Sequence, residues 1–289
     1  DRREFTRSSD GEISGGLLKI DALNLAQLRE GVRWMPEEWA GFWRQAEPQG
    51  QLRQTELSWT GSVEQPTIRQ WKAQAVDVSL RAGPVSKTQP RAPWPGLVGL
   101  NANLSGTASE FQGHVRLEPG TLNWPGLWED PQKNIRGLEA DVWVEHKAQI
   151  SRVQLQRAQL LVDQGRLDLD AQWQGTPSDP LGRLEMTAHA PELEVSLIAP
   201  WLPLNIPSSV RDYVKAALPQ GRALSVQAKV SGRLADFPFE RAGSGEFRIS
   251  AQLADVRFVT LPKALMDART TGEWPTFQNL SGHLVFDRN

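Results

Sequence analysis

The sequence predicts a mainly β fold: a long curved antiparallel sheet that forms an open hydrophobic groove, with a few short amphipathic helices in two tandem repeats. Two observations lead to this prediction. Short segments of alternating apolar and polar residues recur about every ten residues, which is typical of antiparallel strands joined by hairpins. A pattern of helix, turn and strand also occurs twice, at residues 36–61 and 207–232, 171 residues apart without a gap.

The repeated pattern starts with a proline, which is favoured in the first turn of a helix. Apolar residues follow at helical spacing, then Pro-Gln-Gly at 48–50 and 219–221, an alternating segment, and finally Gly61 and Gly232. Repetition at a fixed period is typical of structures built by stacking like units. We therefore expect both copies to fold alike, with each helix presenting its apolar stripe to the sheet of its own repeat.

Three segments follow from this periodicity. Residues 1–93 form a first groove repeat with a helix near 36–46, residues 94–200 form a central antiparallel segment, and residues 201–289 form a second repeat with a helix near 208–218. The spacing of Leu23, Leu25, Ala26 and Leu28 predicts a further helix from residue 22. Alternation predicts two short strands between residues 5 and 20 and others at 52–60, 68–80, 97–104, 111–117, 138–144, 150–155, 158–162, 167–173, 184–188, 193–197, 224–230 and 247–253.

Composition excludes several classes of partner and site. The formal charge is −2 with both signs interspersed, so no basic surface for nucleic acid or anionic lipid headgroups is expected. The chain has no cysteine and therefore no disulfide, thiolate metal site or thiol nucleophile. No apolar run is long enough to cross a bilayer. We interpret the chain as an internal piece of a longer protein whose targeting segment lies elsewhere, because it lacks an initiator methionine and stops within a strand pattern.

No residues point to catalysis. The histidines at 114, 146, 189 and 283 lie on separate predicted strands, and Asp168 and Asp170 alternate with leucines, as on the solvent face of a strand. Neither a nucleophile elbow nor a phosphate-binding glycine loop is present. We therefore expect no enzyme activity, no cofactor and no metal. A sheet with one apolar face must cover that face, either with a second sheet or by curling around apolar ligands such as acyl chains.

The C-terminal part resembles the YhdP-type members of the AsmA-like family. The resemblance rests on Trp201-Leu202-Pro203, the helix at 210–218, Leu-Ala-Asp-Phe-Pro-Phe at 234–239 as the most specific motif, Gly245-Glu246-Phe247, and residues 280–287. It implies an internal fragment of a long periplasmic protein of Gram-negative bacteria, anchored in the inner membrane by a segment absent here. It also implies a bridge-like lipid transfer protein that moves phospholipid towards the outer membrane and contributes to its permeability barrier.

We therefore predict a segment of a lipid conduit, with phospholipid acyl chains as its ligand and a monomeric state. The residues expected to line the groove are Leu167, Leu169, Leu224, Val226, Val230, Phe247, Ile249, Leu253, Val256 and Phe258. Two alternatives stay open. One is a periplasmic scaffold that assists outer-membrane protein assembly by pairing its exposed strand edge with a client strand. The other is a glycan-acting enzyme or lectin on a β sandwich, which aromatic residues on the polar face would favour.

Overall fold

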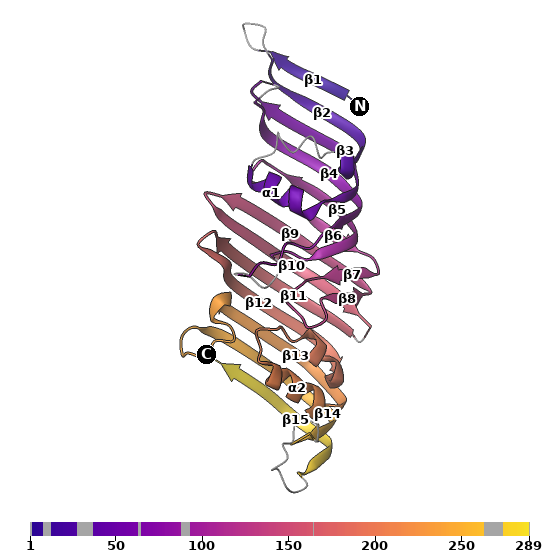
Figure 1. The fold of residues 1–289 in the computed structure, drawn as a ribbon. Helices are drawn as coiled ribbons and strands as arrows, with labels where there is room; N and C mark the ends of the chain where they lie inside the picture. The colour runs from indigo at the N-terminus through magenta and orange to yellow at the C-terminus, as the bar shows by residue number, and fades with distance from the viewer. Residues whose placement is uncertain are drawn as a thin grey trace.

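The computed structural model describes residues 2–7, 13–27, 37–62, 65–87, 93–163, 165–262 and 274–288. Within these residues, fifteen strands form one sheet in which every pairing is antiparallel. The main path runs β1-β2-β3-β4-β5-β6-β9-β10-β11-β12-β13-β14-β15, and the β7–β8 hairpin branches from β5 (Figure 1). The predicted mainly β fold, an open antiparallel sheet with a few short helices, is confirmed.

The strands are β1 (Arg2–Arg7), β2 (Ile13–Asn24), β3 (Gln49–Thr60), β4 (Thr67–Leu80), β5 (Gly96–Gly106), β6 (Glu110–Leu117), β7 (Gly120–Asn123), β8 (Gln132–Ile135), β9 (Gly137–Lys147), β10 (Ile150–Val162), β11 (Gly165–Thr176), β12 (Asp179–Glu194), β13 (Gln220–Arg233), β14 (Gly245–Val259) and β15 (Thr276–Arg288). The helices are α1 (Glu37–Ala46) and α2 (Ser208–Ala217), with short 3₁₀ turns η2 (Val195–Leu197), η3 (Ala199–Trp201) and η4 (Leu234–Asp236).

Three predictions of local structure were wrong, and each failed where a strand is longer than its alternating pattern. Residues 22–24 continue β2 and residues 25–27 form a 3₁₀ turn, in place of the predicted helix, whose Leu28 lies outside the described residues. The segments 150–155 and 158–162 are one strand, β10, interrupted by a bulge at Arg157, whose φ is 52°. The segments 184–188 and 193–197 are likewise the single strand β12 followed by η2. A bulge adds one residue and so breaks the period of two.

The predicted repeat is confirmed by the element boundaries. Helix α1 and strand β3 start at residues 37 and 49, and α2 and β13 start at residues 208 and 220, each 171 residues later. A glycine with positive φ opens both strands, Gly50 at 108° and Gly221 at 124°. A Cβ on either would approach the backbone of the next strand to 2.5 Å, so both positions require glycine. Pro36, which opens the first copy, lies outside the described residues.

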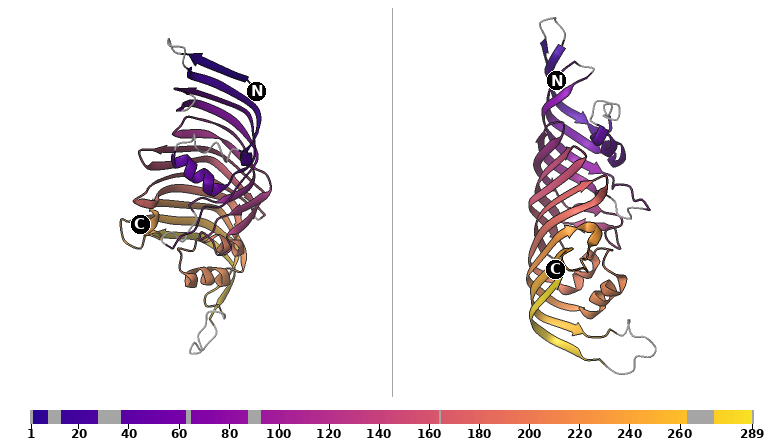
Figure 2. Two further views of the ribbon diagram at one scale, coloured as in Figure 1. Left: turned by 45° about the horizontal axis from the view of Figure 1, so that its top comes forward. Right: turned by 90° about the vertical axis from the view of Figure 1, so that its left-hand side faces the viewer.

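The repeat extends beyond the predicted stretch to four strands, because β2–β5 correspond to β12–β15 in pairing and register. Residues with positive φ fall at matching places on three adjacent strands of each copy, and they are Gln54, Asp77 and Gly99 in the first and Ser225, Asp255 and Asn279 in the second. Stacked bulges bend a sheet, and here the sheet curls towards the side on which both helices lie (Figure 2).

The connections of the main path alternate between two edges of the sheet, as an antiparallel order requires. Helix α1, the β7–β8 hairpin and the segment with η2, η3 and α2 all leave from one edge, which we call the long-connection edge. The tight turns between β9 and β10 and between β11 and β12 lie at the other, the short-turn edge. The predicted segment boundaries after residues 93 and 200 fall between strands that are hydrogen-bonded to each other, β4 with β5 and β12 with β13. The division into three segments therefore stays a prediction.

Candidate functional site

Apolar side chains form continuous rows that cross the sheet at right angles to its strands. Directly paired residues lie on the same face of a sheet, so the rows can be followed strand by strand through the register. One row runs from β4 to β14 through Ala73, Leu104, Gly113, Val142, Leu155, Ala171, Met186, Val230 and Phe247. We call the face that carries this row the groove face and the opposite one the outer face.

Two further rows lie parallel to the first on the groove face. One runs from β4 to β15 through Ala75, Ala102, Val115, Ala140, Ala158, Leu169, Ala188, Ala228, Ile249 and Phe286, passing the bulge of β10 between Ala140 and Ala158. The other consists of Leu100, Leu117, Leu138, Leu160 and Leu167, five leucines on five successive strands. No strand from β5 to β11 breaks this apolar surface with a charged side chain in these rows.

Three structures cover the groove face along the long-connection edge. Trp43 of α1 packs on a buried cluster of Leu25, Ala75, Val78 and Ala102. Leu218, at the end of α2, packs with Val195 of η2 on a second cluster that contains Val256, which is 0% exposed. Between the helices, Leu117 and Ile135 of the β7–β8 region are also fully buried. The part of the groove face nearest this edge is therefore already occupied by the chain's own side chains.

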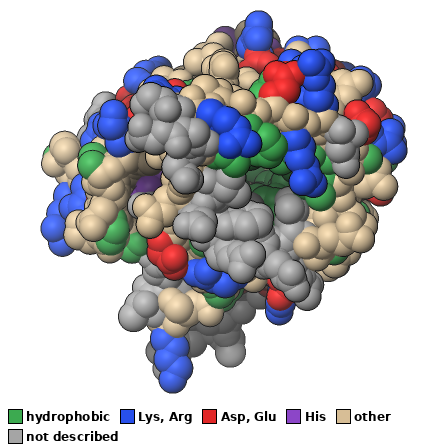
Figure 3. Space-filling view, turned by 90° about the horizontal axis from the view of Figure 1, so that it is seen from above, with side chains coloured by type: hydrophobic (Ala, Val, Ile, Leu, Met, Phe, Trp, Pro, Cys, Tyr) green, Lys and Arg blue, Asp and Glu red, His purple; other side chains and the backbone are tan. Residues whose placement is uncertain are grey.

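The groove face is open towards the short-turn edge. Its side chains in the central strands are only half buried, and they include Val142, Val144, Val153, Leu155, Leu184 and Met186. Viewed along the sheet, the molecule is hollowed, with hydrophobic side chains inside the hollow and charged ones around its outer surface (Figure 3). The apolar rows thus form the floor of a groove that runs along the sheet.

Aromatic rings mark the short-turn edge of the groove. The indole N–H of Trp71 donates to the Thr107 carbonyl at 2.9 Å, and that of Trp173 donates to the Leu181 carbonyl at 2.8 Å. Phe239, from the turn between β13 and β14, is 2% exposed and lies against Gly232 and Gly245. Large rings with polar tips suit a boundary between apolar and wet surroundings.

The outer face is polar and carries ion pairs between strands. The Glu56 carboxylate lies 2.9 Å from the Nζ of Lys19 and 3.1 Å from the Nζ of Lys72. The Nζ of Lys229 lies 2.6 Å from the Glu246 carboxylate. Hydrogen bonds from Lys19 and then Lys72 lower the pKa of the Glu56 carboxyl. These exposed pairs contribute little stability individually, but they keep this face in water, so the two faces of one sheet differ sharply in polarity.

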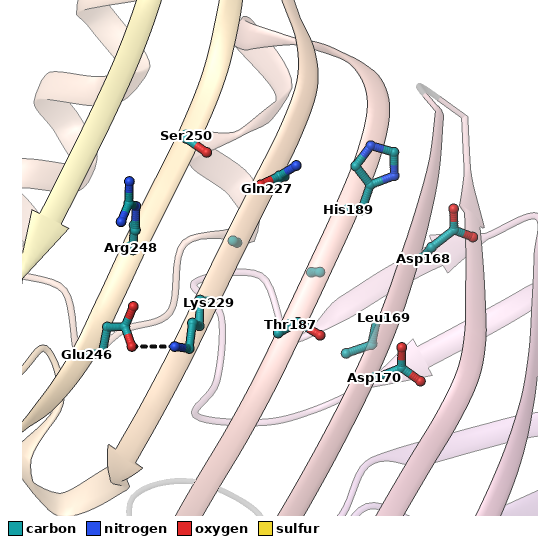
Figure 4. A pocket seen from close by; sticks show the side chains of 12 residues that line it. Asp168, Leu169, Asp170, Thr187, His189, Gln227, Lys229, Glu246, Arg248 and Ser250 are labelled. Atoms are coloured by element: carbon teal, nitrogen blue, oxygen red, sulfur yellow. Dashed lines mark ion pairs between the residues drawn. The ribbon is translucent and has the colours of Figure 1, made fainter.

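A shallow hollow on the outer face is lined from strands β11 to β14. Figure 4 shows side chains of Asp168, His189, Gln227 and Arg248 along these strands, with the Lys229–Glu246 ion pair beside them. Opposite charges alternate within it, and no group of three His, Asp or Glu side chains among the described residues could hold a metal ion. It offers polar contacts of both signs and no concentrated charge.

Nine of the ten residues expected to line the groove lie on the groove face. Val226, Leu253, Val256 and Phe258 belong to the cluster beside η2 and α2. The others, in the rows or between them, are Leu167, Leu169, Val230, Phe247 and Ile249. Contact of these residues with lipid stays a prediction.

The placement of Leu224 on this face was wrong. Leu224 pairs with Gln252 and Glu192 and therefore lies on the outer face. The cause is the bulge at Ser225, which has a φ of 51° and inserts one residue into β13. In a regular strand, residues two apart such as Leu224 and Val226 point to the same face. The bulge between them instead turns Leu224 to the outer face.

A buried lysine in the covering layer was not foreseen. Lys133 on β8 is 9% exposed, and its Nζ lies 6.0 Å and 5.9 Å from the ring centres of Trp128 and Trp201. The Trp128 indole N–H donates to the Trp201 carbonyl at 3.1 Å. These contacts tie the β7–β8 hairpin to the η3 segment. In the sequence Lys133 stands between polar neighbours and gives no sign of burial.

Comparison with known proteins identifies one family. The model of the family described as YhdP protein matches residues 4–289, almost the whole chain. No curated protein and no solved structure matches the chain. No helix among the described residues is long and apolar enough to span a membrane.

Proposed function

We propose that this chain, which belongs to the YhdP family, carries the acyl chains of phospholipids along the groove face of its sheet. The observation that supports this most directly is the continuity of the apolar rows, which pass from strand to strand without a polar side chain from β5 to β11. An acyl chain in such a groove is removed from water at about 0.8 kcal/mol per methylene.

Movement requires that no single position hold the lipid. Each row presents similar small or branched apolar side chains, so an acyl chain shifted by one strand spacing meets nearly the same surface. The open short-turn edge leaves room for the headgroup to stay in water while the chain moves. Transfer is then a slide along the groove, without catalysis, cofactor or metal.

The wider setting is part of the same proposal. The protein would work as a monomer in the periplasm of a Gram-negative bacterium, anchored in the inner membrane by another part of the protein. Phospholipid would pass between the inner and outer membranes, and nucleic acid would not be a partner. The family membership supports this setting at the level of AsmA-like lipid transport.

Site-specific photo-crosslinking tests the proposal. A photoreactive amino acid at Met186 or Ile249, on the groove face, should capture phospholipid, whereas the same residue at Thr187 or Arg248, one position away on the outer face, should not. Val226 is a poorer inward position because it already packs within the cluster beside η2. Equal capture on both faces would contradict the proposal.

A charge in the path gives a functional test of transport. Ile249→Asp would place an ion in the groove at a cost of several kcal/mol unless water reaches it, and we expect it to block lipid passage while the sheet still folds. Ile249→Ala should have little effect, because no single side chain holds the lipid. Normal transport by a folded Ile249→Asp protein would exclude a conduit through this segment.

The assembly scaffold stays as a second candidate, in which a strand edge would accept a client strand. Crosslinks from β15 to polypeptide, combined with no lipid capture at Met186, would favour this function over lipid transport.

A further inference from the structure

The groove-face side chains nearest the short-turn edge are aromatic on both sides of the middle of the sheet. Phe111 of β6 pairs with Gly106, and its ring centre lies 6.2 Å from that of Trp71 on β4. On β11 the ring of Trp173 lies over Gly175, where a Cβ would approach it to 2.5 Å. Large rings therefore stand along this edge on either side of β9 and β10.

Strands β9 and β10, which lie midway along the sheet (Figure 1), interrupt this series of rings. In line with Phe111 and Trp173 they present Val144 and Val153, which pair with each other and are half buried. The structure describes every residue of these two strands, and their only aromatic ring, that of Trp143, lies on the outer face. We call the part of the short-turn edge at these two valines the central gap.

Beyond the two valines, the groove face of the central gap ends in a polar pair. His146 and Ser151 pair directly, two residues further towards the turn and on the same face. The imidazole Nδ1 of His146 lies 2.7 Å from the Ser151 hydroxyl, and both residues are half buried. The other side chains that β9 and β10 place on the groove face are all alanine, valine or leucine. This pair is therefore the polar end of an otherwise apolar surface.

The hydrogen bond holds the imidazole by one nitrogen and leaves the other available. A serine hydroxyl can donate to Nδ1, and the neutral ring then carries its proton on Nε2. Within the described residues, Nε2 of His146 makes no hydrogen bond. Glu145 and Arg152, the neighbours in sequence, form an ion pair on the outer face. No carboxylate on the groove face of these two strands therefore competes for the Nε2 proton.

The polarity of the groove face changes along each of these strands in the order found in a phospholipid. On β9 the side chains run from Ala140 through Val142 and Val144 to His146, and β10 repeats this order in its paired residues. These six residues span about 20 Å of extended strand. An acyl chain on the apolar part places its headgroup beside the polar pair, and a phosphate oxygen accepts strongly from an N–H donor.

We propose that the central gap is the place where a phospholipid headgroup contacts the groove, with His146 Nε2 donating to a phosphate oxygen and Ser151 positioning the ring. The inference rests on the proposed lipid transport and deepens it, because it makes the groove discriminate between lipids with and without a phosphate. The apolar rows contact only hydrocarbon and treat both alike. A free phosphate ion offers the same acceptor oxygens but has no acyl chain to hold it on these rows.

The test compares phosphatidylethanolamine with a diacylglycerol of the same chains. Binding of each to the 289-residue chain is measured by displacement of a fluorescent phospholipid. His146→Phe keeps a ring but removes its N–H, and we expect the ratio of phosphatidylethanolamine to diacylglycerol affinity to fall about three- to tenfold, the range of one hydrogen bond. The affinity for diacylglycerol should not change.

Further variants separate the donor from general packing. His146→Gln keeps an N–H donor and should keep most of the ratio, while Ser151→Ala frees the ring and should lower the ratio less than His146→Phe does. His189→Phe makes the same exchange on the outer face (Figure 4) and should leave the ratio intact. A ratio unchanged by His146→Phe in a protein with the wild-type melting temperature, or an equal fall in His189→Phe, would overturn the inference.

Two measurements identify the source of the phosphate and its place. Inorganic phosphate at millimolar concentration should leave the ratio unchanged, whereas a fall to the value of His146→Phe would reassign the pair to a free anion and overturn the headgroup contact. A phosphatidylethanolamine with a diazirine on its headgroup should label residues 144–153 most strongly. Even labelling along the whole short-turn edge would overturn the assignment to the central gap.

Failure of this site and failure of the proposed function have different signatures. If the wild-type chain bound neither lipid, the proposed lipid transport itself would be contradicted. If it bound both lipids with a ratio that did not depend on His146, only the headgroup contact at the central gap would be wrong.

Discussion

The two repeats of the sheet share one backbone and differ in the side chains that they present. Both have a helix over the groove face, a glycine that opens the next strand, and bulges at the same three places. On the groove face, Gly16 and Trp59 of the first repeat stand where Met186 and Val230 stand in the second. A large and a very small residue thus fill the space that two medium residues fill in the other copy.

The outer faces differ in charge. The first repeat has the triad Lys19, Glu56 and Lys72 across β2, β3 and β4, whereas the second has His189, Gln227 and Ser250 at the same register positions. The shorter side chains of the second copy contribute to the outer-face hollow. The comparison teaches that the glycines and bulges set the curvature, while the facing side chains are free to set local chemistry.

The strongest test of the shared backbone is substitution of the strand-opening glycines. Gly50→Val and Gly221→Val would each place a side chain at positive φ and within 2.5 Å of the neighbouring strand's backbone. We expect each to lower the free energy of unfolding by about 3 kcal/mol or more, measured by urea denaturation. Gly41→Ala in α1, where a Cβ meets nothing within 4 Å, is the control and should stabilise slightly.

If one glycine variant unfolded the chain and the other were tolerated, the equivalence of the two repeats would be limited to sequence. Equal losses would instead establish that both copies depend on the same close approach between strands, since Gly50 lies against Asp77–Val78 and Gly221 against Asp255–Val256.

The cluster residues under the two helices give the next largest effect. Val78 is 6% exposed and Val256 is 0% exposed, at matching positions of β4 and β14. Replacing either with alanine removes two methyl groups and leaves a cavity, so we expect a loss of about 2 kcal/mol at each. Thermal unfolding of the two variants measures this. A clearly smaller loss at Val78 would mean that the first helix covers its cluster less tightly than the second.

The repeat and the fold class were accessible from the sequence because the offset has no gap and the alternation is strong. The bulges could not be predicted from the sequence. A positive φ is usually indicated by glycine, but at two of the bulges the residues with positive φ are Gln54 and Ser225. The misplaced Leu224 follows directly from this. Strands β7 and β8 were missed since each is only four residues long and their residues do not alternate regularly.

The candidate site was only partly predictable. Alternation along one strand assigns each side chain to a face of the sheet. The rows that cross the sheet depend on the register between neighbouring strands, which cannot be read from the sequence. Central residues such as Leu155 and Met186 were therefore absent from the predicted lining, although they lie in the row that crosses the sheet from β4 to β14. Trp43 Nε1 and Thr55 Oγ1, which are buried without a hydrogen-bond partner among the described residues, also needed the structure, because only burial distinguishes them from ordinary residues of a helix and a strand.

A reciprocal exchange sharpens the difference between the groove faces. Thr55 and Val226 occupy matching positions of β3 and β13, and the buried Thr55 hydroxyl has no partner among the described residues. Thr55→Val removes this hydroxyl and should raise the free energy of unfolding by about 1 kcal/mol in lipid-free protein. Val226→Thr introduces such a hydroxyl in the second repeat and should lower it by about 1–2 kcal/mol. Denaturation of both in delipidated form measures the pair. Destabilisation by Thr55→Val would show that the hydroxyl already has a partner in the free protein.

The smallest expected effect concerns the sheet between the repeats, where β6 and β9 carry a titratable cluster on the outer face. His114 lies 3.0 Å from Asp141 and 2.9 Å from Glu139, and Arg157 also pairs with Asp141. The hydrogen bond with Asp141 is the largest cause that raises the pKa of the His114 imidazole above its usual 6.5; burial opposes it, and the hydrogen bond with Glu139 adds to the rise. The same imidazole and Arg157 lower the pKa of Asp141 below 3.8.

A histidine whose pKa is raised on folding stabilises the fold fully below its unfolded pKa, and the contribution disappears as the pH rises through the folded pKa. The wild-type chain should therefore lose slightly more stability between pH 6 and 8 than His114→Gln, with the difference well below that of the core variants because the cluster is solvent-exposed. Melting temperatures across this range measure it. If His114→Gln had the wild-type profile, the central cluster would make no pH-dependent contribution to folding.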